Sequence, residues 1–167
     1  MKKIILGLGS NRPWNNMSCP EILEKAIIEL GTYIRELRCA SFYETEPIPK
    51  TDQNNFINTA VSGLYFHSPQ ELLKRVNETE AMFGRDRSTE TRWGQRSLDI
   101  DILLFGDLVL WEPDLVTPHP ELEKRRFALE PLLELWPDAC SPKTKTPYCK
   151  ICNDLPDQGV KKIYESR

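Results

Sequence analysis

Short apolar runs predict the strands of this chain. Four of them lie at residues 3–9, 37–45, 56–66 and 97–105, and apolar side chains make up most of each. Runs of this length, bounded by turn-forming residues, are typical of strands. Two prolines and several polar residues mark a loop between 46 and 55, and Gly106 with Asp107 forms a turn after the last run.

Two further segments have the apolar period of a helix. Each begins with a capping box, Ser18 to Glu21 and Ser68 to Glu71, in which the serine accepts from a backbone N–H and the glutamate reaches back. The apolar residues that share one face behind these starts are Leu23, Ala26, Ile27, Leu30 and Ile34, then Leu72, Leu73, Val76 and Phe83. Smaller elements are expected at 108–111 (strand), 120–124 and 127–135 (helical), and 159–165 (strand).

The order strand, helix, strand, strand, helix, strand predicts the fold class. It is the order of a ferredoxin-like α+β fold, an antiparallel sheet with helices packed on one face, here followed by C-terminal additions. The other face of such a sheet would be open to a substrate or partner. A length of 167 residues with 40% hydrophobic and 28% charged residues fits one domain spanning residues 1–167.

Charge and hydropathy narrow the classes of function. The net charge is −3, so affinity for phosphate groups has to come from a local cluster rather than from the whole molecule. No apolar stretch is long enough to span a membrane. The start, MKKIILGLGSNRP, has too short an apolar part and no cleavage-type sequence for a signal peptide. We therefore expect a cytoplasmic protein that does not bind membranes or nucleic acid.

Five cysteines make an odd count, which argues against a disulfide framework. Cys149 and Cys152 have the spacing of a metal or redox pair, and Cys140 adds a third thiol. This set is one short of a four-thiolate zinc site. The alternative is that these residues are small apolar side chains on a short terminal helix.

Asp99 and Asp101 interrupt the apolar run at 97–105. Side chains alternate along a strand, so the two aspartates would share one face and have Cα atoms about 6.6 Å apart. The residues expected on the opposite face, against the helices, are Leu98, Ile100, Ile102 and Leu104. Two close carboxylates repel and raise a pKa unless a cation lies between them. Oxygen ligands without His or Cys favour Mg²⁺, and a carboxylate pair can hold two such ions in phosphoryl chemistry.

An arginine-rich segment precedes this pair. From Gly84 to Arg96, GRDRSTETRWGQR has four arginines against two acidic residues, a net charge of +2. Arginine binds phosphate oxygens through two parallel hydrogen bonds, so arginines beside metal-binding carboxylates indicate a nucleoside triphosphate site. Trp93 could stack on a ligand or act as a lid. The alternative is an exposed edge strand with salt bridges to a solvated surface.

The ordered motifs of this chain resemble the 6-hydroxymethyl-7,8-dihydropterin pyrophosphokinase family. The resemblance spans about residues 3–137 and extends to the tail, although the cysteine-rich stretch 140–152 is not a feature of the family. Its motifs are Gly9-Ser-Asn, Ser41-Phe-Tyr-Glu-Thr-Glu-Pro47, Gln53-Asn-Asn-Phe-Ile-Asn58, Glu80 to Arg85, Arg92-Trp-Gly-Gln-Arg96-Ser-Leu-Asp99-Ile-Asp101, Pro118-His119-Pro120 and Arg125-Arg-Phe127. It implies a ferredoxin-like enzyme of folate biosynthesis. The implied reaction transfers pyrophosphate from ATP to the hydroxymethyl group of the pterin and releases AMP.

The resemblance also implies a role for each matching residue. Asp99 and Asp101 would bind two Mg²⁺ ions, and Arg85 and Arg96 would contact the ATP phosphates. Further contacts with ATP are implied for Asn77, Glu80, Arg87, Arg92, Trp93, Ile102, His119 and Arg125. Contacts with the pterin are implied for Thr45, Glu46, Ile48, Phe56, Asn58 and Phe127. The partners would be these small molecules alone, bound by a monomer, and no protein nucleophile would be needed because positioning and charge neutralisation carry phosphoryl transfer.

Two rival functions are open to the same residues. A nucleotidyltransferase also pairs aspartates on a strand, but it usually has a Gly-Ser turn shortly upstream, and here Gly9 and Ser10 lie far from Asp99. An RNA-binding ferredoxin-like module would need exposed stacking aromatics and a basic face. This chain is acidic and has aspartates at that place.

Overall fold

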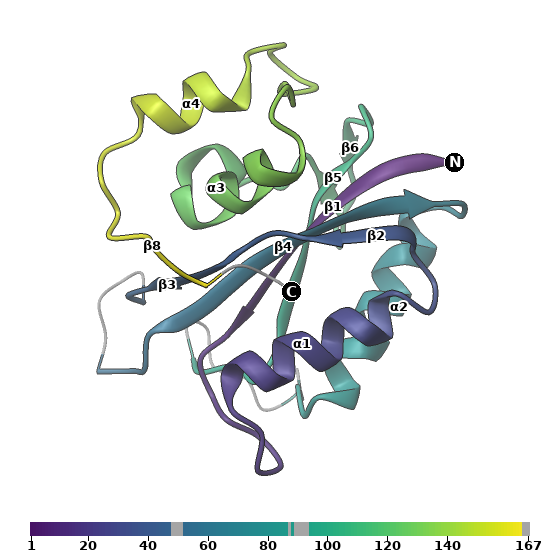
Figure 1. Ribbon diagram of the computed structural model, residues 1–167. Helices are drawn as coiled ribbons and strands as arrows, with labels where there is room; N and C mark the ends of the chain where they lie inside the picture. Colours follow the sequence, from purple (N-terminus) through teal and green to yellow (C-terminus); the bar gives the residue numbers. More distant parts are fainter. Residues whose placement is uncertain (48–51, 87, 89–93, 165–167) are drawn as a thin grey trace.

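The structure is a computed structural model that describes residues 1–47, 52–86, 88 and 94–164. Its centre is an antiparallel sheet (Figure 1), which confirms the α+β class. Neighbouring strands in the sheet are β5 (Asp99–Phe105), β1 (Lys2–Ser10), β4 (Phe56–Tyr65), β3 (Phe42–Thr45) and β8 (Lys161–Tyr164), in that order; β2 (Arg35–Cys39) also pairs with β4.

The run at 37–45 forms two strands, where one was expected. β2 and β3 pair with the same long strand, β4, and are separated by Ala40 and Ser41. The Thr59 hydroxyl lies 3.1 Å from the Ala40 carbonyl oxygen and 3.0 Å from that of Ser41. This side chain from β4 competes for the carbonyls that a continuous ladder would use, and the strand is interrupted there.

Helices cover both faces of the sheet. α1 (Cys19–Leu30) and α2 (Pro69–Met82) pack on one face, where Leu6 and Val61 are buried. The other face is covered by α3 (Arg126–Leu135) and α4 (Tyr148–Asp154) (Figure 1), whose apolar side chains are buried together with Ile5. The expectation of helices on one face only is therefore corrected. The C-terminal additions bring a second set of apolar side chains that has to be buried.

The apolar side chains of β5 divide between the two faces. Leu98, Ile100 and Ile102 are buried beneath α1 and α2 as expected, but Leu104 packs with the α3 cluster. The register with β1 shifts at this point, because Ile5 pairs with Leu104 and Leu6 pairs with Ile102. One extra residue in β5 reverses the alternation beyond it, which places Leu104 on the other face.

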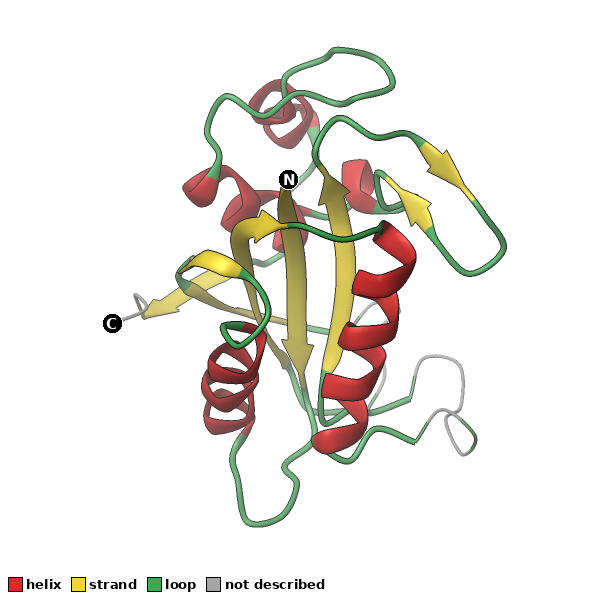
Figure 2. Ribbon diagram, turned by 90° about the vertical axis from the view of Figure 1, so that its right-hand side faces the viewer, coloured by secondary structure: helices red, strands yellow, loops and turns green. Residues whose placement is uncertain are grey.

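The remaining elements agree broadly with the expected ones. Ser68 Oγ accepts from the Glu71 N–H at 3.2 Å and starts α2, while α1 ends at Leu30 and the buried Ile34 follows in a turn. A small hairpin of β6 (Leu110–Trp111) and β7 (Val116–Thr117) stands beside the main sheet (Figure 2). A short 3₁₀ helix, η1 (Leu122–Lys124), leads into α3. The predicted terminal helix for the Cys149 pair is α4.

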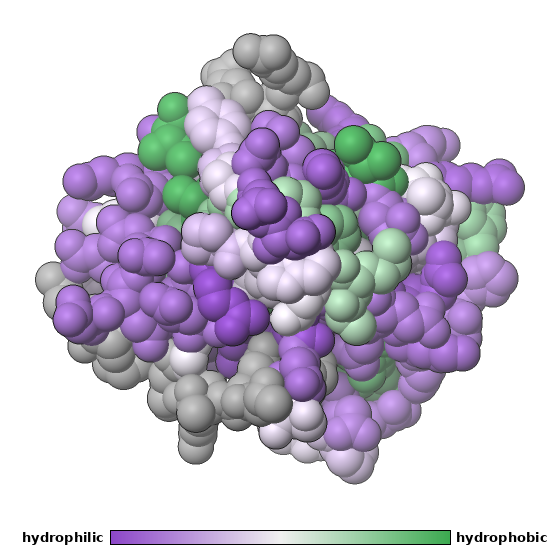
Figure 3. All heavy atoms as spheres, turned by 90° about the horizontal axis from the view of Figure 1, so that it is seen from below, coloured by the Kyte–Doolittle hydropathy of each residue, from purple (hydrophilic) through white to green (hydrophobic). Residues whose placement is uncertain are grey.

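The surface is mostly hydrophilic. In the view from below, apolar side chains form separate patches (Figure 3). The exposed large apolar residues belong to different elements, for example Ile28 on α1, Met82 on α2 and Trp111 on β6. Among the described residues, no helix has the length and apolar character to cross a membrane.

Candidate active site

A pocket of about 700 Å³ lies on the sheet face beside α3. This volume is within the usual range for small-molecule sites, about 300–1,000 Å³. Strands β1, β3, β4 and β5 form its floor, and the turn from η1 into α3 forms one wall. The pocket therefore lies where the C-terminal additions meet the sheet, rather than on a fully open sheet face.

Two glycines of β1 form the centre of the pocket floor. Gly7 and Gly9 lie within the strand, and both line the pocket. A Cβ on Gly9 would come within 2.9 Å of Asn58 Oδ1, and one on Gly7 would lie 3.2 Å from the Leu103 side chain. Glycine at these positions keeps space above the sheet.

The strand register places two groups of polar side chains on either side of this floor. Gly9 pairs with Asn58 of β4 on one side and with Asp99 of β5 on the other, and Gly7 pairs with Asp101. Neighbouring strands lie about 4.8 Å apart, so the Cα atoms of Asn58 and Asp99 are about 10 Å apart. Asn58 and the aspartates are thus adjacent across one strand, although 41 residues separate Asn58 from Asp99 in the sequence.

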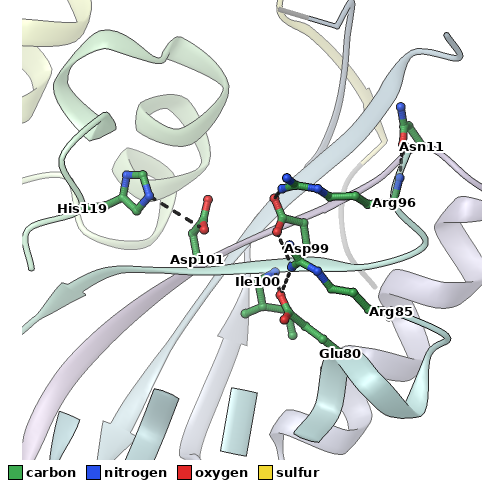
Figure 4. Close-up of polar contacts among 8 residues, drawn as sticks. All are labelled: Asn11, Glu80, Arg85, Arg96, Asp99, Ile100, Asp101 and His119. Carbon is green, nitrogen blue, oxygen red and sulfur yellow. Dashed lines mark hydrogen bonds and ion pairs between the residues drawn. The ribbon is translucent and has the colours of Figure 1, made fainter. Parts of the chain in front are cut away.

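Asp99 is held by two arginines. Arg85 Nη1 contacts its Oδ1, and Arg96 Nη1 donates to Oδ2 at 2.9 Å (Figure 4). Behind it, the buried Glu80 carboxylate contacts Arg85 and accepts from the Ile100 N–H at 2.7 Å. Glu80 thereby joins α2 to the start of β5, and removing one partner of such a buried pair is costly.

Asp101 faces His119 in the pocket. The distance from His119 Nε2 to Asp101 Oδ1 is 3.8 Å, too long for a hydrogen bond (Figure 4). Burial, followed by the positive charge of Arg125, lowers the pKa of His119 to about 4, so the ring is neutral at pH 7. Its Nδ1 accepts from the Glu121 N–H at 3.2 Å, which leaves the proton on Nε2, toward Asp101.

The charge on Asp101 is poorly compensated by the residues that the structure describes. Burial, followed by the negative charge of Asp99, raises the pKa of Asp101 to about 7. Its side chain keeps 39% of its surface exposed and lines the pocket. A bound cation would lower this pKa, because it would favour the carboxylate.

The segment between Gly84 and Arg96 is anchored at both ends by the loop after β1. Asn11 and Arg12 donate their N–H groups to the Arg96 carbonyl at 3.0 and 3.1 Å, and Arg96 donates its own N–H to Asn11 Oδ1 at 2.8 Å. At the other end, Gly84 has φ +80° and packs on Trp14, where an added Cβ would lie 2.2 Å from Nε1. The start and end of the arginine-rich segment are therefore fixed.

On the β4 side of the pocket, a buried amide is oriented by a hydroxyl. Asn58 Nδ2 donates to Thr45 Oγ1 at 2.7 Å, and both side chains are buried. This bond turns Asn58 Oδ1 toward Gly9. Phe56 and Phe127 also line the pocket, each half-buried. A pocket with an oriented amide and aromatic side chains suits a flat heterocycle with donor and acceptor groups.

Comparison with known proteins identifies the family. Residues 5–137 match the family of 7,8-dihydro-6-hydroxymethylpterin-pyrophosphokinase, or HPPK. The chain belongs to the HPPK family. It is therefore a pyrophosphokinase of folate synthesis, as the resemblance implied.

Relatives and solved structures agree with this membership. The 2-amino-4-hydroxy-6-hydroxymethyldihydropteridine pyrophosphokinase of Aquifex aeolicus is 36% identical over 147 residues, 88% of this chain and 88% of that protein. The folate synthesis bifunctional protein of Arabidopsis thaliana is 34% identical over 80% of this chain, which spans only 27% of that protein. Wild-type Plasmodium falciparum HPPK-DHPS shares the fold, with a TM-score of 0.70 at 15% identity over 91% of this chain and 44% of that one.

The HPPK pocket brings together ten of the residues implied by the resemblance. They come from the end of β3, from β4, from β5 and the residues just before it, and from the segment from His119 to α3: Thr45, Glu46, Phe56, Asn58, Arg96, Asp99, Asp101, His119, Arg125 and Phe127. Asn77, Glu80, Arg85 and Ile102 do not line it. Arg85 and Glu80 support Asp99 from behind. Ile102 is buried on the opposite face of β5 from Asp101, so its side chain does not reach the pocket. Ile48, Arg87, Arg92 and Trp93 lie outside the described residues.

Some pocket residues were not found from the sequence. The apolar run at 3–9 predicts a strand that ends at Gly9, whereas Gly7 and Gly9 both lie inside β1 and line the pocket. Their spacing of two was the available signal, because it places both on one face of a strand. Gln158 also lines the pocket. It belongs to the tail beyond the matched region, where no motif pointed to it.

The donor set fits Mg²⁺. Mg²⁺ is usually held by one or two carboxylates together with water and substrate phosphates, and Asp99 and Asp101 supply such a pair. In the described part of the chain, no group of three or more His, Cys, Asp and Glu side chains is arranged to hold a metal. The described residues therefore do not form a metal site from protein ligands alone. The pocket is compatible with a metal site in which a phosphate of the substrate supplies further ligands.

Proposed function

We propose that this chain transfers the pyrophosphoryl group of ATP to the hydroxymethyl group of 6-hydroxymethyl-7,8-dihydropterin, in a Mg²⁺-dependent reaction that releases AMP. The observation that carries the proposal is the place of Gly9 between Asn58 and Asp99 in the sheet. A pterin on the Asn58 side and phosphates on the Asp99 side would meet above a glycine, where no side chain intervenes.

The aspartate side of the pocket is the proposed phosphate site. Asp99 and Asp101 would hold two Mg²⁺ ions, which supply charge neutralisation for the triphosphate when they are bound. Arg96 lines the pocket and can turn its guanidinium from Asp99 to a phosphate oxygen, because bidentate binding suits both groups. Arg85 would remain close behind, tied to Glu80.

His119 and Arg125 are proposed to orient the nucleotide. The neutral His119 ring presents an N–H next to Asp101, and Arg125 places a cation on the same wall of the pocket. These groups add donors where negative charge develops during transfer. No side chain is required as a nucleophile, since the hydroxymethyl oxygen of the pterin attacks the β-phosphorus.

The Asn58 side of the pocket is the proposed pterin site. The Asn58 amide, oriented by Thr45, offers both a donor and an acceptor to the edge of the ring. Phe56 and Phe127 would pack on its faces, and Glu46 lies at the same end of the pocket. A contact with Ile48 stays a prediction, because this residue lies outside the described part of the chain.

The proposal is tested by nucleotide analysis of complete and incomplete reactions. With ATP, MgCl₂ and hydroxymethyldihydropterin, we expect AMP in equal amount to the pterin consumed. Omission of the pterin or addition of excess EDTA should abolish AMP formation. Release of pyrophosphate with the nucleotide attached to the pterin would instead indicate the rival nucleotidyltransferase.

Three finer predictions accompany this function. A ferredoxin-like topology is supported by the strand order β5, β1, β4, β3 with two crossover helices. A monomer is supported by the scattering of exposed apolar side chains over different elements. The cytoplasmic location stays a prediction.

A further inference from the structure

The tail beyond the family match is fastened to the wall of the pocket. The match ends at residue 137, while α4 and the segment after it continue the chain. This tail contacts the stretch Leu122–Phe127, which carries Arg125 and Phe127 into the pocket. The pocket wall is thus built from two segments that lie more than 20 residues apart in the sequence.

Gln158 makes the most direct of these connections. Its Nε2 donates to the Lys124 carbonyl at 2.9 Å, and its Oε1 accepts from the Arg126 N–H at 2.9 Å. Both bonds reach backbone groups, one on each side of Arg125. Arg126 is the first residue of α3, so its N–H has no partner within the helix, and Gln158 provides one.

Two more connections restrain the same stretch. The Arg126 guanidinium donates to the carbonyls of Cys152 and Leu155 at 3.0 Å each, which ties it to the end of α4. Ser141 Oγ donates to Glu123 Oε1 at 2.7 Å. The backbone around Arg125 is therefore held from several points of the tail, and only Gln158 among these tail residues also lines the pocket.

We propose that Gln158 is a positioning residue of the pyrophosphokinase site. By bonding to the backbone on both sides of Arg125, it holds the guanidinium of Arg125 on the pocket wall before the substrates bind. Fixing a binding group in advance lowers the ordering cost of binding. The inference rests on the proposed contact of Arg125 with ATP.

The test compares Gln158→Ala and Gln158→Met with the wild type. Methionine keeps the length of the side chain but makes neither hydrogen bond. For both variants we expect the KM for ATP to rise about 10-fold, the scale of one to two neutral hydrogen bonds. Lys150→Ala is the matched control, because Lys150 is an exposed residue on α4 in the same tail. It should keep a KM within about 2-fold of the wild type, the scale of a surface change.

A double-mutant cycle separates positioning from a general structural role. In an Arg125→Ala background, Gln158→Ala should no longer raise the KM for ATP, since the group that it positions is absent. An equal rise in both backgrounds would overturn the inference, because Gln158 would then act independently of Arg125. A wild-type KM in both Gln158 variants would also overturn it.

Different experimental results would contradict this inference and the proposed function. If the wild type produces no AMP from ATP and the pterin, the proposed function fails. If the wild type is active and the two Gln158 variants match it, only the positioning role fails.

Discussion

Asp101 combines burial, a nearby carboxylate and access to the pocket. Asp101→Asn keeps the shape of this side chain and removes its charge, so the phosphates would lose part of their charge neutralisation. We expect turnover at saturating Mg²⁺ to fall at least about 100-fold. The fold should persist, since Asp101 makes no hydrogen bond within the sheet other than those of its backbone. A near-native rate would contradict the assignment of the metal ligands.

Arg96 is expected to act on the chemical step. Its backbone is fixed by Asn11, so Arg96→Ala removes the guanidinium without releasing the chain. We expect kcat to fall more than KM rises, because the guanidinium would bind charge that develops during transfer. Steady-state kinetics check this, with the exposed Lys74→Ala on α2 as a control. An increase in KM alone would contradict this role.

Gly9 allows a test of the pterin side of the pocket. In Gly9→Ala the new methyl group would meet Asn58 Oδ1 and displace the amide, while in Gly7→Ala it would meet only the flexible side chain of Leu103. We expect the KM for the pterin to rise about 10-fold in Gly9→Ala and clearly less in Gly7→Ala. Equal effects in the two variants would show that lost space, rather than the position of Asn58, is responsible.

Among the elements, α3 depends on a charged residue that ties it to the sheet. Glu134 accepts from the Ser41 N–H at 2.8 Å and from Lys162 Nζ at 3.1 Å, and it contacts the Tyr43 hydroxyl. Burial alone would raise the pKa of Glu134, but the hydrogen bonds to these partners outweigh it and lower the pKa. The carboxylate therefore stabilises the fold in its ionised form.

The lowered pKa of Glu134 predicts that the free energy of unfolding depends on pH. Glu134→Gln should be less stable than the wild type at pH 7 by about 1 kcal/mol, a value discounted for partial exposure. Because the folded-state pKa is lowered, the stabilisation is complete above the unfolded pKa of about 4.3 and is lost as the pH falls through the folded value. Urea unfolding at pH 7 and pH 3.5 should show the difference shrinking. The exposed Glu24→Gln on α1 is the control, and its free energy of unfolding at pH 7 should equal that of the wild type within about 0.5 kcal/mol.

The elements were predictable where one local pattern decides them. The capping box at Ser68 and the apolar period behind it predicted the start of α2, and alternation placed Asp99 and Asp101 on one face of β5. The bulge that moves Leu104 and the break between β2 and β3 depend on neighbouring strands. Both features arise from contacts between residues that are distant in the sequence, so local sequence patterns cannot predict them.

At the scale of the whole molecule, the site is an assembly of distant segments. The adjacency of Asn58 and Asp99 follows from strand pairing on both sides of Gly9, which the order of motifs alone did not reveal. The tail contributes Gln158 from outside the family match. The residue types in the sequence were enough to predict the chemistry. The way the Asn58 side and the Asp99 side of the pocket are arranged could be known only from the fold.

The central claim is that the β- and γ-phosphates move together to the pterin. It is tested most directly by following the label of ATP that carries ³²P at the β-position, in the presence of Mg²⁺ and hydroxymethyldihydropterin. The label should appear in the pterin product, and the AMP should be unlabelled. Label recovered in ADP, or in free pyrophosphate while the pterin carries the nucleotide, would contradict it.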